Sequence, residues 1–142
     1  MIYFDTSYLV RLYYHDPGAD QVRALAATDH IACAALGQAE MIAAFHRKLR
    51  EGAIKAAAYA ALVEQVEAHI KGGAFQWLAQ DQAILARVRS VYRKLPSSVF
   101  LRGADAIHLA TSAEAGFRTI YSNDAHLIAA ARHFGIEGVN VI

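Results

Sequence analysis

The chain has 142 residues, with 14 lysines and arginines against 13 aspartates and glutamates, for a formal net charge of +1. This length suits one domain with a buried core, so we expect residues 1–142 to form a single domain. A nearly neutral chain has no overall basic field, so any anionic partner must be bound locally. Only two prolines and 19% charged residues exclude a disordered chain.

The hydrophobic content of 56% comes largely from 30 alanines rather than from long apolar segments. The longest stretch without acidic residues, lysine or arginine runs from His30 to Ala39, about half of what a bilayer-spanning helix needs. The first residues reach a charge at Asp5 without the basic start and apolar run of a secretory signal. We therefore expect a cytoplasmic protein with no membrane segment. The single cysteine, Cys33, excludes an intrachain disulfide and a multi-cysteine zinc site.

The first half of the chain predicts two strands and four helices. The expected elements are a strand at 1–5, a helix from 6 to 11 or 14, a helix at 17–28, a strand at 30–35, and an antiparallel pair of helices at 36–50 and 53–71. Thr6 or Ser7 can cap the first helix through its side-chain oxygen. Pro17 suits the first turn of the second helix, and Gly52 ends the third.

The second half predicts three more strands alternating with helices. The expected elements are a strand at 74–78, helices at 81–95 and 103–116, a strand at 119–122, a helix at 124–134 and a strand at 139–142. Apolar residues recur at spacings of three and four in the helices, whereas the strands are short and apolar throughout. This pattern predicts an α/β fold: a three-layer α/β/α sandwich with a central, mostly parallel sheet of about five strands.

Four acidic residues are expected at the carboxyl edge of this sheet. Asp5 closes the first strand and Asp124 follows the fourth, while Glu40 and Asp105 lie early in helices that can open onto the same edge. Ligand sites of open parallel sheets lie beyond the carboxyl ends of the strands. Each acid alone could instead stabilise a helix N-terminus. Asp5 is least suited to that role, because two hydroxyl residues that can cap a helix follow it.

Four carboxylates placed together repel one another unless cations neutralise them. Carboxylate oxygens suit a hard divalent ion such as Mg²⁺ or Mn²⁺, whereas zinc prefers histidine or cysteine. One or two such ions can activate water and stabilise the leaving oxygen of a phosphodiester. The four acids therefore predict phosphodiester hydrolysis without a covalent enzyme intermediate.

Four segments of the chain resemble the PIN domain family and, within it, the VapC-type toxins of toxin–antitoxin pairs. The segments are YFDTSYLVRLYY, ALGQAEMIAAFHR, LRGADAIHLATSAEAG and TIYSNDAHLIAAARHFGI. They span essentially the whole chain, in the family's order, and the four acids fall on the family's acidic positions. The resemblance implies a magnesium- or manganese-dependent endoribonuclease, usually a homodimer, that an antitoxin holds silent.

The resemblance also implies roles for individual residues. Three acids would anchor the metal and the fourth would complete its shell or orient water: Asp5, Asp105 and Asp124, and then Glu40. Two hydroxyl neighbours of the acids would hold carboxylates or water by hydrogen bonds: Thr6 and Ser122. Three arginines could contact the phosphates of bound RNA: Arg11, Arg47 and Arg102.

Two other functions stay open on the sequence alone. One is a PIN nuclease of RNA processing or turnover that has no antitoxin, and the other is a catalytically inactive PIN-like binding module. Four retained acids favour an enzyme, because clustered charge is costly to keep without a purpose. A histidine zinc site is disfavoured, although Asp105 and His108 have a suitable i,i+3 spacing, because no HExxH motif occurs. We expect His108 to pack beside the acids.

Overall fold

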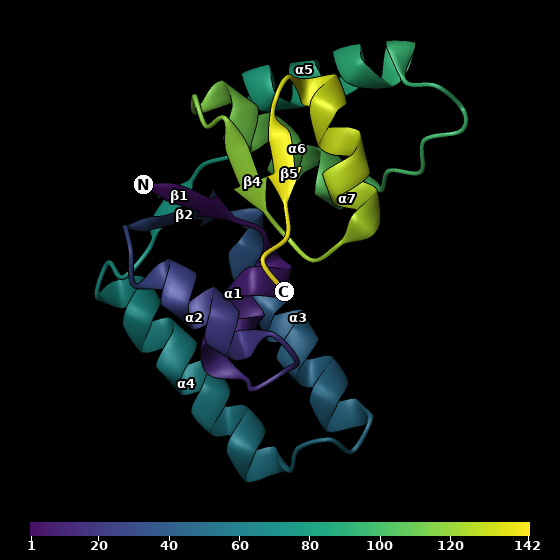
Figure 1. Ribbon diagram of the computed structural model, residues 1–142. Coiled ribbons are helices and arrows are strands. Elements are labelled where there is room, and N and C mark those ends of the chain that lie inside the picture. The colour runs from purple at the N-terminus through teal and green to yellow at the C-terminus, as the bar shows by residue number, and fades with distance from the viewer.

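The computed structural model describes residues 1–142 and has a five-stranded parallel sheet at its centre (Figure 1). The strands are β1 (Ile2–Phe4), β2 (Ile31–Ala34), β3 (Gln76–Leu78), β4 (Thr119–Tyr121) and β5 (Glu137–Val139). Their spatial order is β3-β2-β1-β4-β5, and all neighbours run parallel. Along the chain, β2 and β3 are added on one side of β1, and β4 and β5 are then added on its other side. The strand order therefore reverses between β1 and β4, which is where open parallel sheets bind ligands.

Helices cover both faces of the sheet. They are α1 (Thr6–Tyr13), α2 (Ala19–Ala26), α3 (Leu36–Arg50), α4 (Ala56–Lys71), α5 (Gln82–Lys94), α6 (Gly103–Glu114), α7 (Ala125–Ala130) and the short 3-10 helix η1 (Ala131–Phe134). Figure 1 shows α1 to α4 on one side of the strands and α5 to α7 on the other. The predicted three-layer α/β/α sandwich is confirmed. None of the helices is both long and apolar enough to cross a membrane.

The two apolar cores explain why the strands are apolar throughout. Tyr3 and Ala32 pack with α5, α6 and α7, while their neighbours Phe4 and Cys33 pack with α1, α3 and α4. Successive side chains of a strand point to opposite faces. Because both faces are covered, every strand residue next to the centre of the sheet must be apolar or small.

The position predicted for the last strand, 139–142, is wrong. The strand β5 spans Glu137–Val139, so it lies earlier in the chain. A Cβ at Gly138 would lie 2.6 Å from Cα of Ile128, so glycine allows β5 to pass directly beneath α7. Beyond β5 the chain leaves the sheet, and the backbone N–H of Val141 donates to the hydroxyl of Tyr8 at 2.8 Å.

Other boundaries differ by a few residues from the sequence expectations. The helix expected from Pro17 begins at Ala19, because Gly18 adopts a left-handed backbone with φ of 83°. The expected starts at 53 and 74 move to Ala56 and Gln76. The helix expected at 124–134 is α-helical only to Ala130 and then tightens into η1. The helix expected at 36–50 has the predicted bounds.

Candidate active site

A cleft of about 750 Å³ opens at the carboxyl ends of β1 and β4, the point where the strand order reverses. The four acids predicted from the sequence all line it: Asp5, Glu40, Asp105 and Asp124. They come from four segments, namely the end of β1, the second turn of α3, the first turn of α6 and the residue before α7. The other polar and charged residues lining the cleft are Thr6, Ser7, Arg47, Arg50, Arg102, His108 and Asn123.

Asp5 both ends β1 and caps α1. Its Oδ1 accepts hydrogen bonds from the backbone N–H of Tyr8 at 3.1 Å and from the hydroxyl of Ser7 at 2.6 Å. The expectation that Thr6 or Ser7 caps this helix is wrong, because α1 already begins at Thr6 and the extended residue before it is Asp5. On its other oxygen, Oδ2, Asp5 accepts from the hydroxyl of Ser122 at 2.5 Å.

Only 5% of Asp5 is exposed, and this burial raises the pKa of its carboxyl. Hydrogen bonds from Ser122 and Ser7 oppose the rise but do not cancel it. Burial disfavours the charged form of a carboxyl, whereas a nearby positive charge favours it. Positive charge in the cleft would therefore favour the ionised form of Asp5.

Glu40 is held by a buried network that begins at the sheet. Its Oε2 accepts from the hydroxyl of Thr6 at 2.6 Å and lies 3.2 Å from Nε2 of His108. Nδ1 of His108 lies 3.0 Å from the hydroxyl of Tyr3, which also accepts from the backbone N–H of Ala34. The carboxylate of Glu40 thus reaches the cleft with one oxygen already fixed from behind.

The same network sets the charge of its two ionisable members. Burial alone would raise the pKa of Glu40, but hydrogen bonds from His108 and Thr6 outweigh it and lower this pKa. Burial opposes protonation of His108, yet the neighbouring Tyr3, Cys33 and Glu40 raise its pKa well above the ordinary value. Both pKa directions favour the charged forms of Glu40 and His108 at the wall of the cleft.

Arg102 bridges the other two acids. Its Nε lies 2.9 Å from Oδ2 of Asp105, and its Nη2 lies 3.0 Å from Oδ2 of Asp124. The other carboxylate oxygen of Asp124, Oδ1, caps α7. It accepts from the backbone N–H of His126 at 2.8 Å and from that of Leu127 at 3.1 Å. One guanidinium therefore partly neutralises two carboxylates from different helices.

A comparison with protein-family models identifies the family of the chain. Residues 2–135 match the family model of the PIN domain. The chain belongs to the PIN domain family. No curated protein sequence matches it.

Solved structures share this PIN fold at low sequence identity. The structure of FitAcB from Neisseria gonorrhoeae aligns with a TM-score of 0.79 and 18% identity, over 99% of this chain and 97% of that chain. Mycobacterium tuberculosis VapC20, described as a toxin that cleaves the sarcin-ricin loop, gives a TM-score of 0.68 and 16% identity, over 92% of this chain and 95% of that chain. Rickettsia felis VapBC2, bound to a promoter DNA fragment, gives a TM-score of 0.66 and 15% identity, over 99% of this chain and 98% of that chain. Likeness at this identity shows the fold alone.

Two hydroxyl groups of this PIN domain donate hydrogen bonds to acids on other segments of the chain. Thr6 follows Asp5 in sequence but donates to Glu40, whereas Ser122 precedes Asp124 but donates to Asp5. Ser122 also accepts from the backbone N–H of Asp124 at 2.9 Å, so it links two acids. Sequence adjacency suggested that these hydroxyls matter, but only the folded chain shows which carboxylate each one holds.

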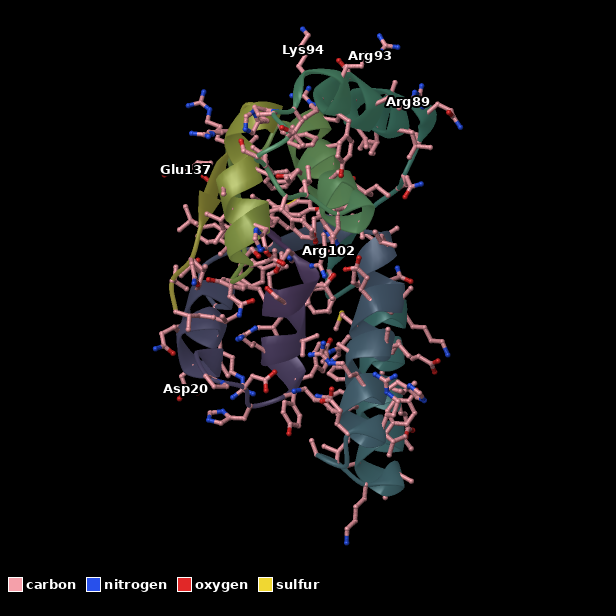
Figure 2. All side chains as sticks on the ribbon, turned by 90° about the vertical axis from the view of Figure 1, so that its right-hand side faces the viewer. Asp20, Arg89, Arg93, Lys94, Arg102 and Glu137 are labelled. Atoms are coloured by element: carbon pink, nitrogen blue, oxygen red, sulfur yellow. The ribbon has the colours of Figure 1, made fainter.

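Basic residues of the PIN domain lie in the cleft, beside it and far from it. Arg47 lines the cleft with an exposed guanidinium whose Nε lies 3.7 Å from Glu51. Arg11 does not line the cleft, and it donates to the backbone oxygens of Pro17 and Ser7 at 2.9 Å and 2.8 Å. Figure 2 shows three basic residues of α5 at the end of the molecule away from Arg102: Arg89, Arg93 and Lys94.

Four polar cleft residues were not predicted as parts of the site: Ser7, Arg50, Asn123, and His108, which was expected only to pack beside the acids. The spacing of Arg50, three residues after Arg47 on one helix, was an available signal. Ser7 offered a weaker one, since a hydroxyl two residues after an acid can bond back to it. The role of Asn123 had no local signal, because it reaches the cleft only through the turn between β4 and α7.

The donor set of this cleft fits a hard divalent cation. No three Asp, Glu, His or Cys side chains are placed to share one metal ion in this structure, and Arg102 binds Asp105 and Asp124. The side chains facing the cleft offer carboxylate and hydroxyl oxygens, and both ring nitrogens of His108 already have partners. Mg²⁺ and Mn²⁺ prefer oxygen ligands, whereas zinc prefers nitrogen and sulfur. The guanidinium of Arg102 marks a place where these carboxylates accept positive charge.

Proposed function

We propose that this PIN domain is a metal-dependent endoribonuclease that hydrolyses RNA phosphodiesters. The observation that carries the proposal is the composition of one cleft, in which four carboxylates from four segments face three arginines. Carboxylates can bind a divalent cation, and guanidinium groups can bind phosphate. Membership of the PIN domain family supports the same activity.

Four residues would hold Mg²⁺, or Mn²⁺ in its place: Asp5, Asp105, Asp124 and Glu40. When bound, such an ion lowers the pKa of a water ligand and neutralises charge on the phosphate. Thr6 and His108 hold Glu40 so that its second oxygen can orient the attacking water. The water oxygen loses a proton as it bonds to phosphorus, the bond from phosphorus to the leaving oxygen breaks, and the leaving oxygen takes up a proton. No covalent enzyme intermediate forms.

The arginines position the RNA. Arg47 and Arg50 project from α3 at one wall of the cleft, and Arg102 lies at the other. A guanidinium bound to phosphate fixes the backbone without reading the base. With a metal ion bound by the acids, Arg102 would be free to bind a phosphate of the substrate. Arg11 is kept as a weaker phosphate contact, because its donors already bond to the protein backbone.

The proposal extends to a toxin of a toxin–antitoxin pair, acting in the cytoplasm as a homodimer and silenced by a cognate antitoxin. The resemblance of four sequence segments to VapC-type toxins supports this role. A solved structure of the same fold, VapC20, is described as a toxin. An RNA-processing PIN nuclease without an antitoxin is the alternative for an active enzyme.

Cleavage of labelled single-stranded RNA and of total cellular RNA tests the activity. We expect cleavage with Mg²⁺ and with Mn²⁺ that is lost with a chelator and in Asp5→Asn. Asp20→Asn is the matched control, because Asp20 is an exposed acid on α2 away from Arg102 (Figure 2). This variant should cleave RNA at the rate of the parent chain. A folded protein that cleaves neither substrate with either metal would contradict the proposal and favour the binding module.

Induced expression in bacteria tests the toxin role. We expect growth arrest with the parent chain, none with Asp5→Asn, and recovery on co-expression of a small neighbouring gene. RNA cleavage in the test tube without growth arrest would instead favour the RNA-processing alternative.

A further inference from the structure

Phe100 is an exposed aromatic ring held outward by its neighbours. It lies in the segment between α5 and α6, and 57% of it is exposed. Val99 and Leu101 on either side pack against the apolar core. The backbone N–H of Val99 donates to the carbonyl of Pro96 at 2.9 Å, and the hydroxyl of Tyr92 donates to the carbonyl of Leu101 at 2.7 Å. Because both neighbours are anchored, the Phe100 ring stays on the surface.

The ring of Phe100 is paired with an imidazole beside the acids. The centroids of the Phe100 and His126 rings lie 4.7 Å apart, at an interplanar angle of 59°. His126 follows Asp124 by two residues, and its backbone N–H donates to Oδ1 of that acid. Phe100 precedes Arg102 by two residues, and Arg102 binds the other oxygen of Asp124. Neither ring lines the cleft itself, but each lies two residues from a residue that does, Arg102 or Asp124.

Single exposed apolar side chains are common on protein surfaces, so exposure alone indicates no function. The distinguishing feature of Phe100 is that its ring is paired with a second exposed ring, that of His126, close to the acids. Every nucleobase has a π-face that stacks on an aromatic ring, and proteins that bind single strands combine such rings with basic residues. The pair of Phe100 and His126 stands next to Arg102, which supplies the positive charge.

We propose that Phe100, supported by His126, is a stacking platform for an unpaired base of the nucleotide next to the scissile phosphate. This inference rests on the proposed nuclease function and requires that the base on the platform be unpaired. A base inside a duplex is stacked on its neighbours and cannot lie flat on the ring. The platform orients the strand and tolerates different bases, because stacking does not read hydrogen-bonding edges.

Binding of a short RNA that carries one 2-aminopurine tests the platform without cleavage. The RNA is titrated with protein in a chelator and again with Mg²⁺ at short times, and the fluorescence quench of the stacked base is measured. We expect Phe100→Ala to weaken binding about 5- to 20-fold, the lower part of the range for base–aromatic stacking, and to lose the quench. Phe100→Trp should restore both, and a fully paired RNA should bind weakly to all variants.

Phe75→Ala is the matched control. Phe75 is a half-buried aromatic ring 6.5 Å from the ring of His69, and it directly precedes β3. It therefore lies at the amino edge of the sheet, opposite the acids, and its replacement should leave the quench unchanged. Thermal unfolding of each variant verifies that the fold is intact.

The outcomes separate the platform from the nuclease. Metal-dependent cleavage with an unchanged quench in Phe100→Ala would overturn the platform and leave the nuclease. A quench lost only in Phe100→Ala, with no cleavage under any metal, would support the platform and overturn the nuclease. A parent chain that binds no single-stranded RNA in either condition, or a Phe100→Ala variant that changes only the oligomeric state in sedimentation, would overturn the platform.

Discussion

Nε2 of His108 lies 3.2 Å from Oε2 of Glu40, although the two residues are 68 positions apart in the chain. His108 is an almost fully buried residue of α6, while Glu40 reaches into the cleft from α3. This contact joins the two helical layers across the carboxyl edge of the sheet. It gives the candidate active site a rigid wall whose charge depends on pH.

The charged pair predicts a pH-dependent stability. Folding raises the pKa of His108 and lowers that of Glu40. The pair therefore stabilises the fold most between the ordinary values of 4.5 for Glu and 6.5 for His. Its contribution is lost as the pH falls through the lowered pKa of Glu40, or rises through the raised pKa of His108.

Replacing His108 by Gln tests this pair in metal-free protein. We expect the free energy of unfolding to fall by about 1–3 kcal/mol between those two pH values, with a smaller difference at high pH. Urea unfolding at a series of pH values measures it. The exposed His30→Gln serves as the control and should leave the profile unchanged. A loss that is the same at every pH would show that the pair is not charged.

Removing Arg102 should strengthen metal binding. The guanidinium pairs with Asp105 and Asp124 and competes with any cation for them. Its side chain is 62% exposed, so the two ion pairs are worth about 0.2–1 kcal/mol each. We expect Arg102→Ala to bind Mn²⁺ about 2- to 10-fold more tightly by calorimetry, yet to bind RNA more weakly. Arg47→Ala should weaken RNA binding without changing Mn²⁺ affinity. Equal or weaker Mn²⁺ binding by Arg102→Ala would refute this competition.

Replacement by alanine should reduce RNA cleavage at one buried serine and leave it unchanged at another. Ser122 donates to Asp5 and accepts from the N–H of Asp124, so Ser122→Ala should reduce cleavage about 10- to 100-fold. Ser112 on α6 is also fully buried, but its hydroxyl has no hydrogen-bond partner. Ser112→Ala should therefore keep full activity and leave stability equal or higher. Cleavage rates and thermal midpoints of both variants decide; matching activities would remove Ser122 from the site.

Glycine at position 138 is required by packing. A Cβ there would lie 2.6 Å from Cα and 2.9 Å from the carbonyl oxygen of Ile128, and this backbone cannot easily move. We expect Gly138→Ala to lower the free energy of unfolding by about 1–3 kcal/mol. Gly103→Ala is the control, because no atom lies within 4 Å of a Cβ at that helical position. Its stability should be unchanged or higher, since alanine reduces the freedom of the unfolded chain.

The sequence by itself determined the type and order of the elements. Periodic apolar residues and Gly52 defined the helix at 36–50, and short apolar runs defined the strands that both helical layers cover. The order of strands and helices also placed Asp5 and Asp124 at one edge of the sheet. These features are readable because periodicity and turn residues act locally, over one or two turns of chain.

Tertiary structure alone decided which groups meet. Local patterns indicate that a side chain is buried, but they do not identify its partner on another element. For this reason the sequence did not show that Ser122 holds Asp5 or that Arg102 bridges two acids. The late position expected for the last strand failed for the same reason, because β5 is placed by its pairing with β4 and its contact with α7. The cap of α1 by Asp5 was missed for another reason: it is a local bond to the N–H of Tyr8, and Thr6 and Ser7 are equally suitable capping residues beside it. Contacts between distant segments depend on how the sheet brings those segments together, and no local pattern records that arrangement.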